Sequence, residues 1–340
     1  MPSFRQVSSN TAGARALIAV GFLLLLTMTG CSEASSVLAP ASFAGREIAT
    51  LFWVLVGVSA VIFFSVVGLL LFSVLRFRPG PGRPEPNQVH GNLRLEIVWT
   101  ILPAIILAGI FVAMFQTMNA VTLPQTGALK VVVTGHQWWW EVSYPEQEIT
   151  TATDIHVPAG QPVEIELISA DVLHSFWVPE LAGKIDAFPE RSTWVRFKAD
   201  NPGIFRGRCA EFCGAQHANM GFLVIAETSE QFEEWVESLQ KPAPAPASDP
   251  ARRGARAFSA SGCGGCHTIE GTQSQGKTGP NLTHFGSRQT VAALTMDNTP
   301  DNLTLWLGDP QSIKPSTKMT TMQVSAETIR DLVAYLEELK

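Results

Sequence analysis

Two uncharged apolar segments near the N-terminus constrain the fold more strongly than any other feature of the chain. They cover residues 48–75 and 97–115, and each is long enough to cross the hydrocarbon core of a bilayer as a helix. The loop between them holds four arginines: Arg76, Arg78, Arg83 and Arg94. Because positively charged loops stay in the cytoplasm, we expect a transmembrane hairpin over residues 44–119 and an exported remainder.

A shorter apolar run precedes this hairpin. Arg5 and Arg15 come before residues 16–28, a run too short to span a bilayer, and Thr29-Gly30-Cys31 follows it. This order is typical of an export signal, and small residues before a cysteine are typical of a lipoprotein cleavage site. We expect residues 1–31 to be a signal segment and Cys31 to carry lipid. Ordinary signal cleavage nearby and an uncleaved anchor are the alternatives.

Residues 120–228 are expected to form a β domain. Apolar residues alternate with Glu164 and Glu166 over residues 163–167, as in a strand with one buried face. Further short apolar runs cover residues 131–133 and 222–225, and Gly and Pro residues punctuate the gaps. Several short strands joined by turns predict a small sandwich or barrel.

Residues 229–250 are expected to hold a helix and a linker. The helix covers 229–239, with Ser229 as a candidate cap and no ideal capping box. Alternating Pro and Ala residues then favour an extended, semi-rigid linker over 241–250. Residues 251–340 would be a separate helical domain, with an apolar stripe at helical spacing near its end: Ile329, Leu332, Val333 and Leu336.

The strongest motif in the β domain is Cys209-Ala-Glu-Phe-Cys213-Gly-Ala-Gln-His217-Ala-Asn-Met220. Sulfur and imidazole ligands together select copper or zinc, and a thioether favours copper. His174, further upstream, can supply a second imidazole. Two thiolates bridging two copper ions, each with one histidine and Met220 as a weak ligand, would form a dinuclear copper centre. A zinc site, a disulfide and a copper chaperone are the alternatives.

Cys263-Gly-Gly-Cys266-His267 is a motif for covalent attachment of haem c, with His267 as an axial ligand. A redox disulfide and half of a zinc site are the alternatives. The segment ending at Met319 resembles the methionine loop of class I cytochromes c, with Ser316 in place of the usual glycine. Met319 is therefore the expected second axial ligand. The alternatives are Met296, Met322 and His284.

With these motifs the sequence resembles subunit II of cytochrome c oxidase. The resemblance is carried by residues 95–107, Gly135-His-Gln-Trp-Trp-Trp140, Leu173-His-Ser-Phe176 and the copper loop. It implies a two-helix transmembrane hairpin followed by an all-β cupredoxin-like barrel. The haem motif adds an all-α class I cytochrome c domain.

The same resemblance implies roles for three further residues. Glu211 would give its backbone carbonyl to copper and its carboxylate to a magnesium ion shared with subunit I. Trp138 would be the residue at which electrons enter the copper centre, with core packing as the alternative. Glu96 would lie near the mouth of a proton-uptake path into subunit I, with an ordinary interfacial carboxylate as the alternative.

The implied protein is subunit II of a bacterial haem–copper oxidase of the caa type. It would sit in the bacterial cell (inner) membrane beside subunit I and other oxidase subunits, with its copper and haem domains on the periplasmic side. Electrons from cytochrome c or a quinol–cytochrome c reductase would reach subunit I, where dioxygen is reduced to water and protons are pumped. The mild net charge of −6 gives no sign of nucleic acid as a partner.

Three other functions compete with this interpretation. A quinol oxidase subunit II keeps the fold but lacks copper, and the complete set of copper ligands argues against it. A copper-delivery or assembly factor has no need of a covalent haem. A copper-containing electron-transfer subunit of another terminal reductase remains an alternative, although nitrous oxide reductase carries a large catalytic domain that this sequence lacks.

Overall fold

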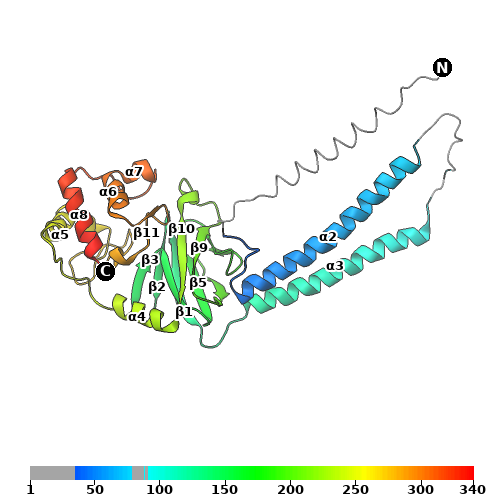
Figure 1. Ribbon diagram of the computed structural model, residues 1–340, viewed down its shortest axis with the longest axis horizontal. Helices are drawn as coiled ribbons and strands as arrows, with labels where there is room; N and C mark the ends of the chain where they lie inside the picture. The colour runs from blue at the N-terminus through cyan, green and yellow to red at the C-terminus, as the bar shows by residue number, and fades with distance from the viewer. Residues whose placement is uncertain (1–34, 79–87, 89–90) are drawn as a thin grey trace, which may run out of the picture. The chain divides into compact units, whose positions relative to one another are not determined.

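The computed structural model describes residues 35–78, 88 and 91–340 (Figure 1). The expected signal segment 1–31, with Cys31, lies outside these residues, as does Arg83. In the described part, two long helices precede two five-stranded sheets, and a group of short helices follows. The expected order of a helical hairpin, a β domain and a helical domain is confirmed.

The hairpin consists of α2 (Phe43–Arg76) and α3 (Leu93–Thr122), both long and apolar enough to cross a membrane. Both helices extend beyond the uncharged runs. Each begins at a side-chain cap, since Ser42 and Asn92 accept hydrogen bonds from backbone N–H groups in the first turn. Pro103 lies inside α3, which neighbouring helices can accommodate in a membrane.

The β domain has two sheets, with strand orders β3-β2-β1-β5-β8 and β4-β10-β9-β6-β7. The strands are β1 (Leu129–His136), β2 (Trp139–Tyr144), β3 (Ile149–Ala152), β4 (Asp154–Pro158), β5 (Val163–Ser169), β6 (His174–Trp177), β7 (Ile185–Ala187), β8 (Thr193–Phe197), β9 (Gly203–Cys209) and β10 (Gly221–Glu227). Strands β1 and β5 pair in parallel, as do β4 and β10, and all other neighbours are antiparallel. The three apolar runs seen in the sequence lie in β1, β5 and β10.

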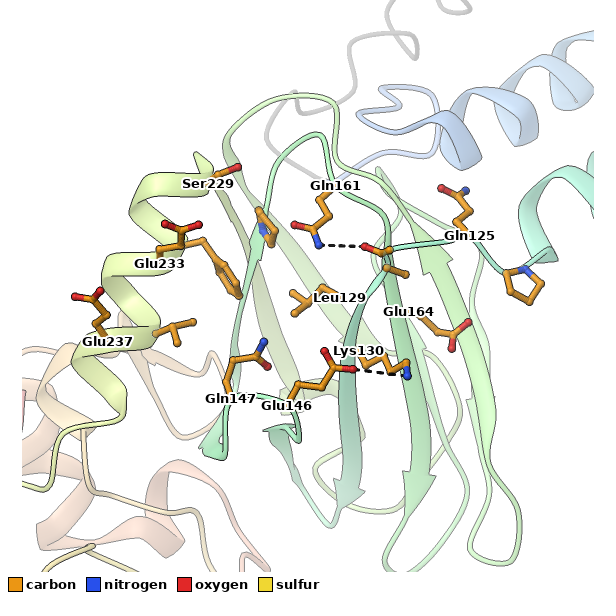
Figure 2. A pocket seen from close by; sticks show the side chains of 16 residues that line it. Gln125, Leu129, Lys130, Glu146, Gln147, Gln161, Glu164, Ser229, Glu233 and Glu237 are labelled. Carbon is orange, nitrogen blue, oxygen red and sulfur yellow. Dashed lines mark hydrogen bonds and ion pairs between the residues drawn. The ribbon is translucent and has the colours of Figure 1, made fainter.

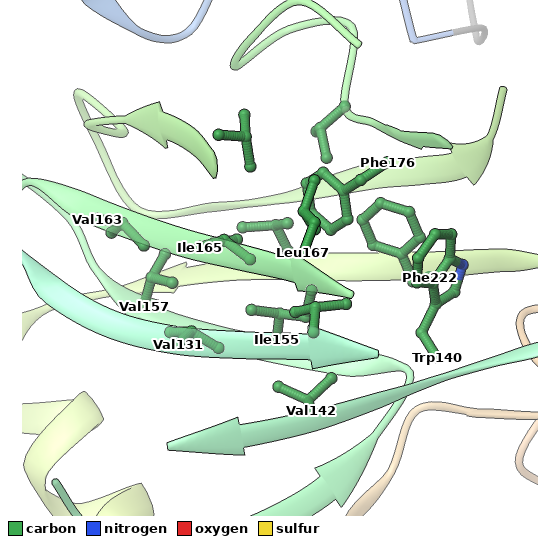
Figure 3. Close-up of a cluster of buried hydrophobic side chains, with 14 of the residues drawn as sticks. Val131, Trp140, Val142, Ile155, Val157, Val163, Ile165, Leu167, Phe176 and Phe222 are labelled. Atoms are coloured by element: carbon green, nitrogen blue, oxygen red, sulfur yellow. The ribbon is translucent and has the colours of Figure 1, made fainter. Parts of the chain in front are cut away.

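The core of the β domain lies between the two sheets (Figure 3). Alternation along β5 buries one face, as its glutamates predicted. Trp140, Phe176 and Phe222 form a fully buried aromatic group beside His174, with ring centroids 4.3 to 6.0 Å apart. Gly207 is required beneath this group, because a Cβ there would lie 2.2 Å from the Phe222 ring.

Helix α4 (Ser229–Leu239) packs on this domain and has the expected bounds. The expectation for its cap was wrong. Thr228, not Ser229, is the N-cap, and its side chain and that of Gln231 form a complete capping box. Trp235 of α4 stacks on His156 and contacts the ring of Tyr144.

The C-terminal domain has its own apolar core. Its helices are α5 (Asp249–Ala260), α6 (Pro300–Gly308), α7 (Pro310–Ile313) and α8 (Ala326–Glu338), with a small pair of strands, β11 (Thr290–Val291) and β12 (Met296–Asp297). The linker is shorter than expected: Ser248 caps α5, so Asp249 and Pro250 belong to the helix. Proline suits this first turn because its missing N–H has no helical partner there.

Candidate copper and haem sites

The four candidate ligands of the copper motif and the upstream His174 converge at one end of the β domain. The Sγ atoms of Cys209 and Cys213 lie 3.8 Å apart. His174 Nδ1 lies 3.9 Å from Cys209 Sγ, and His217 Nδ1 lies 3.7 Å from Cys213 Sγ. Met220 Sδ lies 3.8 Å from Cys213 Sγ. The structure therefore brings every predicted copper side chain to one place.

Strand pairing explains this convergence. Cys209 ends β9 and His174 begins β6, and these strands are paired. The chain then loops back through a short 3-10 helix, His217–Asn219, before β10. Cys209 N donates to Met220 O at 2.9 Å, closing the loop. A sharp loop between antiparallel strands thus holds four of the predicted ligands, and a neighbouring strand adds the fifth.

The donor set fits a soft metal ion. Both cysteines are free and buried, and His174 and Met220 are almost wholly buried. The hydrogen bond between the two sulfur atoms lowers the pKa of the Cys209 thiol, whereas that same bond and burial raise the pKa of Cys213. One thiolate therefore forms readily, and the second requires a cation to neutralise it.

Asp171, which was not singled out from the sequence, contacts one of the predicted copper ligands. Its Oδ1 lies 2.9 Å from His174 Nε2, and the other imidazole nitrogen faces the sulfurs. Burial disfavours a charged imidazole, but hydrogen bonds to Cys209 and Asp171 outweigh this and raise the pKa of His174. A carboxylate behind a metal-binding histidine fixes its ring orientation. The spacing Asp171-x-x-His174 was the available sequence signal.

Two side-chain donors bind the backbone of the copper loop. Gln137 Nε2 and Trp138 Nε1 both donate to Cys213 O, at 2.8 and 3.0 Å. The Trp138 side chain is only 8% exposed. Gly214 leaves room for this ring, since a Cβ there would lie 3.1 Å from it. Trp138 therefore contacts the backbone of a predicted copper ligand directly.

Glu211 and Glu96 occupy different environments. The Glu211 carbonyl lies 3.3 Å from Cys209 Sγ, facing the sulfur pair, while its carboxylate lies 3.7 Å from Lys184 Nζ. Glu96 lies in the first turn of α3, a helix of 30 residues whose far end leads to the β domain. At 1.5 Å per residue this helix is about 45 Å long, so Glu96 does not belong to the copper site.

The haem motif forms a separate site in the C-terminal domain. Cys263 lies in the 3-10 helix Cys263–Gly265, and Cys266 is exposed and free to react. His267 Nδ1 lies 2.8 Å from Pro280 O, which leaves Nε2 for the iron. Gly279 permits this ring position, because a Cβ there would lie 2.6 Å from His267. These contacts fit an axial histidine.

The candidate second axial ligands are not equivalent. Met296, Met319 and Met322 all pack at the edge of the haem-domain core. The loop of Met319 is shaped by Gln311 Nε2, which donates to the Thr317 and Met319 carbonyls at 2.8 and 2.7 Å. His284 Nε2 instead lies 3.0 Å from Lys241 O, a linker carbonyl.

A groove of about 820 Å³ lies between α4 and β1 (Figure 2). Its lining includes Glu233 and Glu237 on α4 and the ion pair of Lys130 with Glu146, whose charged atoms are 3.6 Å apart. None of the residues lining this groove is a predicted copper or haem ligand. The groove therefore adds nothing to the two sites.

Three family models match the chain. They are the transmembrane domain of cytochrome c oxidase subunit II over residues 32–117, its periplasmic domain over 147–227, and cytochrome c over 251–340. These matches follow the order of the hairpin, the β domain and the helical domain. They support a membrane protein with its folded domains outside the cytoplasm.

Curated relatives agree with these matches. Cytochrome c oxidase subunit 2 of Alkalihalophilus pseudofirmus is 37% identical over 294 residues, which are 83% of this chain and 85% of the relative. The subunit of the same name from Bacillus sp. (strain PS3) is 35% identical, over 78% of this chain and 80% of the relative. Quinol oxidase subunit 2 of Bacillus cereus is 33% identical, over 65% and 78%.

The chain belongs to the cytochrome c oxidase subunit 2 family and carries a C-terminal cytochrome c domain. It is thus one subunit of an oxidase complex. The family implies copper for the β domain and haem for the C-terminal domain.

Proposed function

We propose that this chain is the subunit through which electrons enter a proton-pumping cytochrome c oxidase of the caa type. It would pass electrons from a cytochrome c or a quinol–cytochrome c reductase, by way of its haem and copper domains, to subunit I. The observation that carries this proposal is the convergence of Cys209, Cys213, His174, His217 and Met220 in one site, where all but His217 are buried.

The ligand set supports a dinuclear copper centre. Two thiolates 3.8 Å apart, with one imidazole beside each sulfur, suit two bridged copper ions. The carbonyl of Glu211 and the thioether of Met220 would complete the two ions as weak ligands. When bound, such a centre accepts and releases one electron with little change in geometry.

The surrounding residues would keep that geometry fixed. Asp171 orients His174, and Gln137 and Trp138 hold the backbone of Cys213. The buried aromatic group around Trp140 excludes water from the inner side of the loop. A dry and rigid ligand shell lowers the reorganisation that accompanies electron transfer.

In the haem domain, Cys263 and Cys266 would attach the haem covalently and His267 would bind its iron. Met319 is the proposed second axial ligand, because its loop is the one that Gln311 holds in shape. Histidine with methionine gives a relatively high reduction potential, which suits delivery of electrons to copper.

The proposed partners and peripheral roles follow from the same assignment. Phe212 in the copper loop is 76% exposed and Leu173 is 44% exposed, which suits contact with subunit I and other oxidase subunits. The Glu211 carboxylate would bind a magnesium ion there, and Glu96 would serve proton uptake. Trp138 would be the point where electrons enter the copper centre. The protein would lie in the bacterial inner membrane, with Cys31 lipidated.

A quinol oxidase subunit is the main competing function, given the relative in Bacillus cereus. A chain of that kind does not need copper, and it would have no reason to bury two free thiols beside two imidazoles. A copper-delivery factor is disfavoured by the haem motif.

Electron paramagnetic resonance of the oxidised, copper-loaded chain tests the proposal. An electron shared equally between two copper nuclei should give a seven-line hyperfine pattern. A four-line pattern from one copper ion, or no copper signal, would refute the dinuclear assignment. Cys213→Ser should abolish the dinuclear signal and serves as the control.

A further inference from the structure

Lys314 links the haem domain to the copper domain. Its side chain is only 3% exposed. Its Nζ donates to three backbone carbonyls: Trp138 O at 2.8 Å, Asn219 O at 2.7 Å and Ala292 O at 2.9 Å. Two of these carbonyls belong to the copper domain and one to the haem domain. All three donors of the ammonium group are therefore used at the boundary between the domains.

Neighbouring contacts extend the same boundary. Gln216 Nε2, in the copper loop, donates to Pro315 O at 2.8 Å. Gly221 N, at the end of that loop, donates to Ala293 O at 3.1 Å. A Cβ on Gly221 would lie 2.9 Å from Leu294, so the two backbones approach closely. The contacts around Lys314 thus join two loops of the haem domain to the copper loop.

Lys314 is close in the sequence to the proposed haem ligand. The loop from Lys314 to Met319 carries the proposed axial methionine. Trp138, whose carbonyl accepts from Lys314, also donates from its ring to Cys213 O at 3.0 Å. A short series of bonds and hydrogen bonds therefore connects the methionine loop, through Lys314 and Trp138, to a copper ligand.

A buried ammonium group is costly unless its hydrogen bonds are made. Burial lowers the pKa of Lys314 to about 7. An apolar side chain of similar length would avoid that cost, but it would offer no donor to the three carbonyls. A lysine with three fixed acceptors defines one register between the domains, whereas apolar packing tolerates several.

We propose that Lys314 is a positioning residue for electron transfer, which holds the methionine loop against Trp138 and the copper loop in a single register. This inference rests on the proposed function, because it takes the two domains to be consecutive electron carriers. Lys314 itself binds neither group. Its role is to fix the separation of the two sites, on which the transfer rate depends.

The test uses the full chain, purified with copper and haem, and compares three proteins. Lys314→Met removes the donors while keeping a similar length, and Lys340→Met makes the same change at an exposed position. A photoexcited ruthenium complex reduces the haem, and copper reduction is followed over a dilution series and a salt series. We expect a concentration-independent rate in wild type and a loss on the order of tenfold or more in Lys314→Met.

The salt dependence of the transfer rate distinguishes a positioning role of Lys314 from a general effect on folding. Without Lys314, the ion pair of Lys318 with Asp171, 3.7 Å apart, remains at this boundary. That lysine side chain is exposed, so transfer in Lys314→Met should become salt-sensitive. The copper and haem spectra should be unchanged, and Lys340→Met should match wild type in every measurement.

A second measurement uses only the wild-type chain, so it decides the question even if Lys314→Met does not fold. Acetylation of the native wild-type chain with an N-hydroxysuccinimide ester should spare Lys314 and modify Lys340, as read by peptide mass spectrometry. Equal modification of both lysines would overturn the inference, as would a wild-type transfer rate in Lys314→Met. Absence of copper reduction in wild type would instead overturn the proposed function, and the acetylation result would still decide whether Lys314 is buried between the domains.

Discussion

Asp171 should determine how tightly the β domain holds copper, although it is not a ligand. Its Oδ1 faces His174 Nε2 and accepts from Val172 N, and its Oδ2 accepts from Gln137 N. Asn at this position keeps only one acceptor oxygen. In either amide orientation, an NH2 group therefore faces a donor that the carboxylate now satisfies.

The magnitude follows from these contacts. Carboxylates behind metal-binding histidines typically account for a factor of about 10 to 100 in metal affinity, or about 1.4 to 2.7 kcal/mol. We expect Asp171→Asn to weaken copper binding within that range. Asp171→Ala should weaken it further, because both oxygens are lost and the partly buried Gln137 N–H loses its acceptor.

Competition titration against a copper chelator measures this effect in the purified chain, and the copper hyperfine pattern reports the geometry of the site. Asp297→Asn is the control, since it makes the same chemical change on an exposed carboxylate of the haem domain. A copper affinity of Asp171→Asn within twofold of wild type would show that the carboxylate does not orient His174.

Three further predictions concern individual residues. Met220→Leu should retain copper but shift its reduction potential, as read by redox titration, because a weak axial thioether contributes little binding. Ser316 has a φ of 71°, so Ser316→Gly should raise the free energy of unfolding of the haem domain by up to about 1 kcal/mol in denaturant titrations. Two hydrogen bonds from Arg253 lower the pKa of Asp331. This carboxylate therefore stabilises the fold above its unfolded-state pKa, and the contribution is lost as pH falls through the lower folded-state pKa. Asp331→Asn should reduce stability at pH 7 and flatten the loss of stability towards pH 3, measured by denaturant unfolding at both pH values.

The predicted copper side chains lie together in the structure, and most of them are local in the sequence. Four of the five lie between Cys209 and Met220, and a loop of this length between paired strands has little freedom. His174 was the one distant ligand that sequence reasoning had to supply. The hairpin was also predictable, since apolar length alone decides which segments can span a bilayer.

Contacts between distant segments could not be predicted in the same way. In the sequence, Lys314 is only part of a Lys-Pro turn. Its burial depends on the carbonyls of three residues that are distant in the sequence: Trp138, Asn219 and Ala292. The choice between Met319 and Met322 could not be predicted from the sequence either, because both side chains pack on the same core. Boundary errors were smaller: Thr228 and Ser229 can both cap a helix, and Asp249-Pro250 suits a first turn as well as a linker.

The linker, residues 241–248, has a different role from that of a free spacer. The Glu338 side chain accepts from Ala247 N and Ser248 N, and Ala243 packs on the haem-domain core. Most of the linker therefore belongs to the haem domain, so its extended length does not set the distance between the two sites. That distance is set by the contacts around Lys314. Trp138 is only 8% exposed, so under the proposed function we expect a separate electron donor to approach the haem domain on a surface other than the one that meets the copper loop.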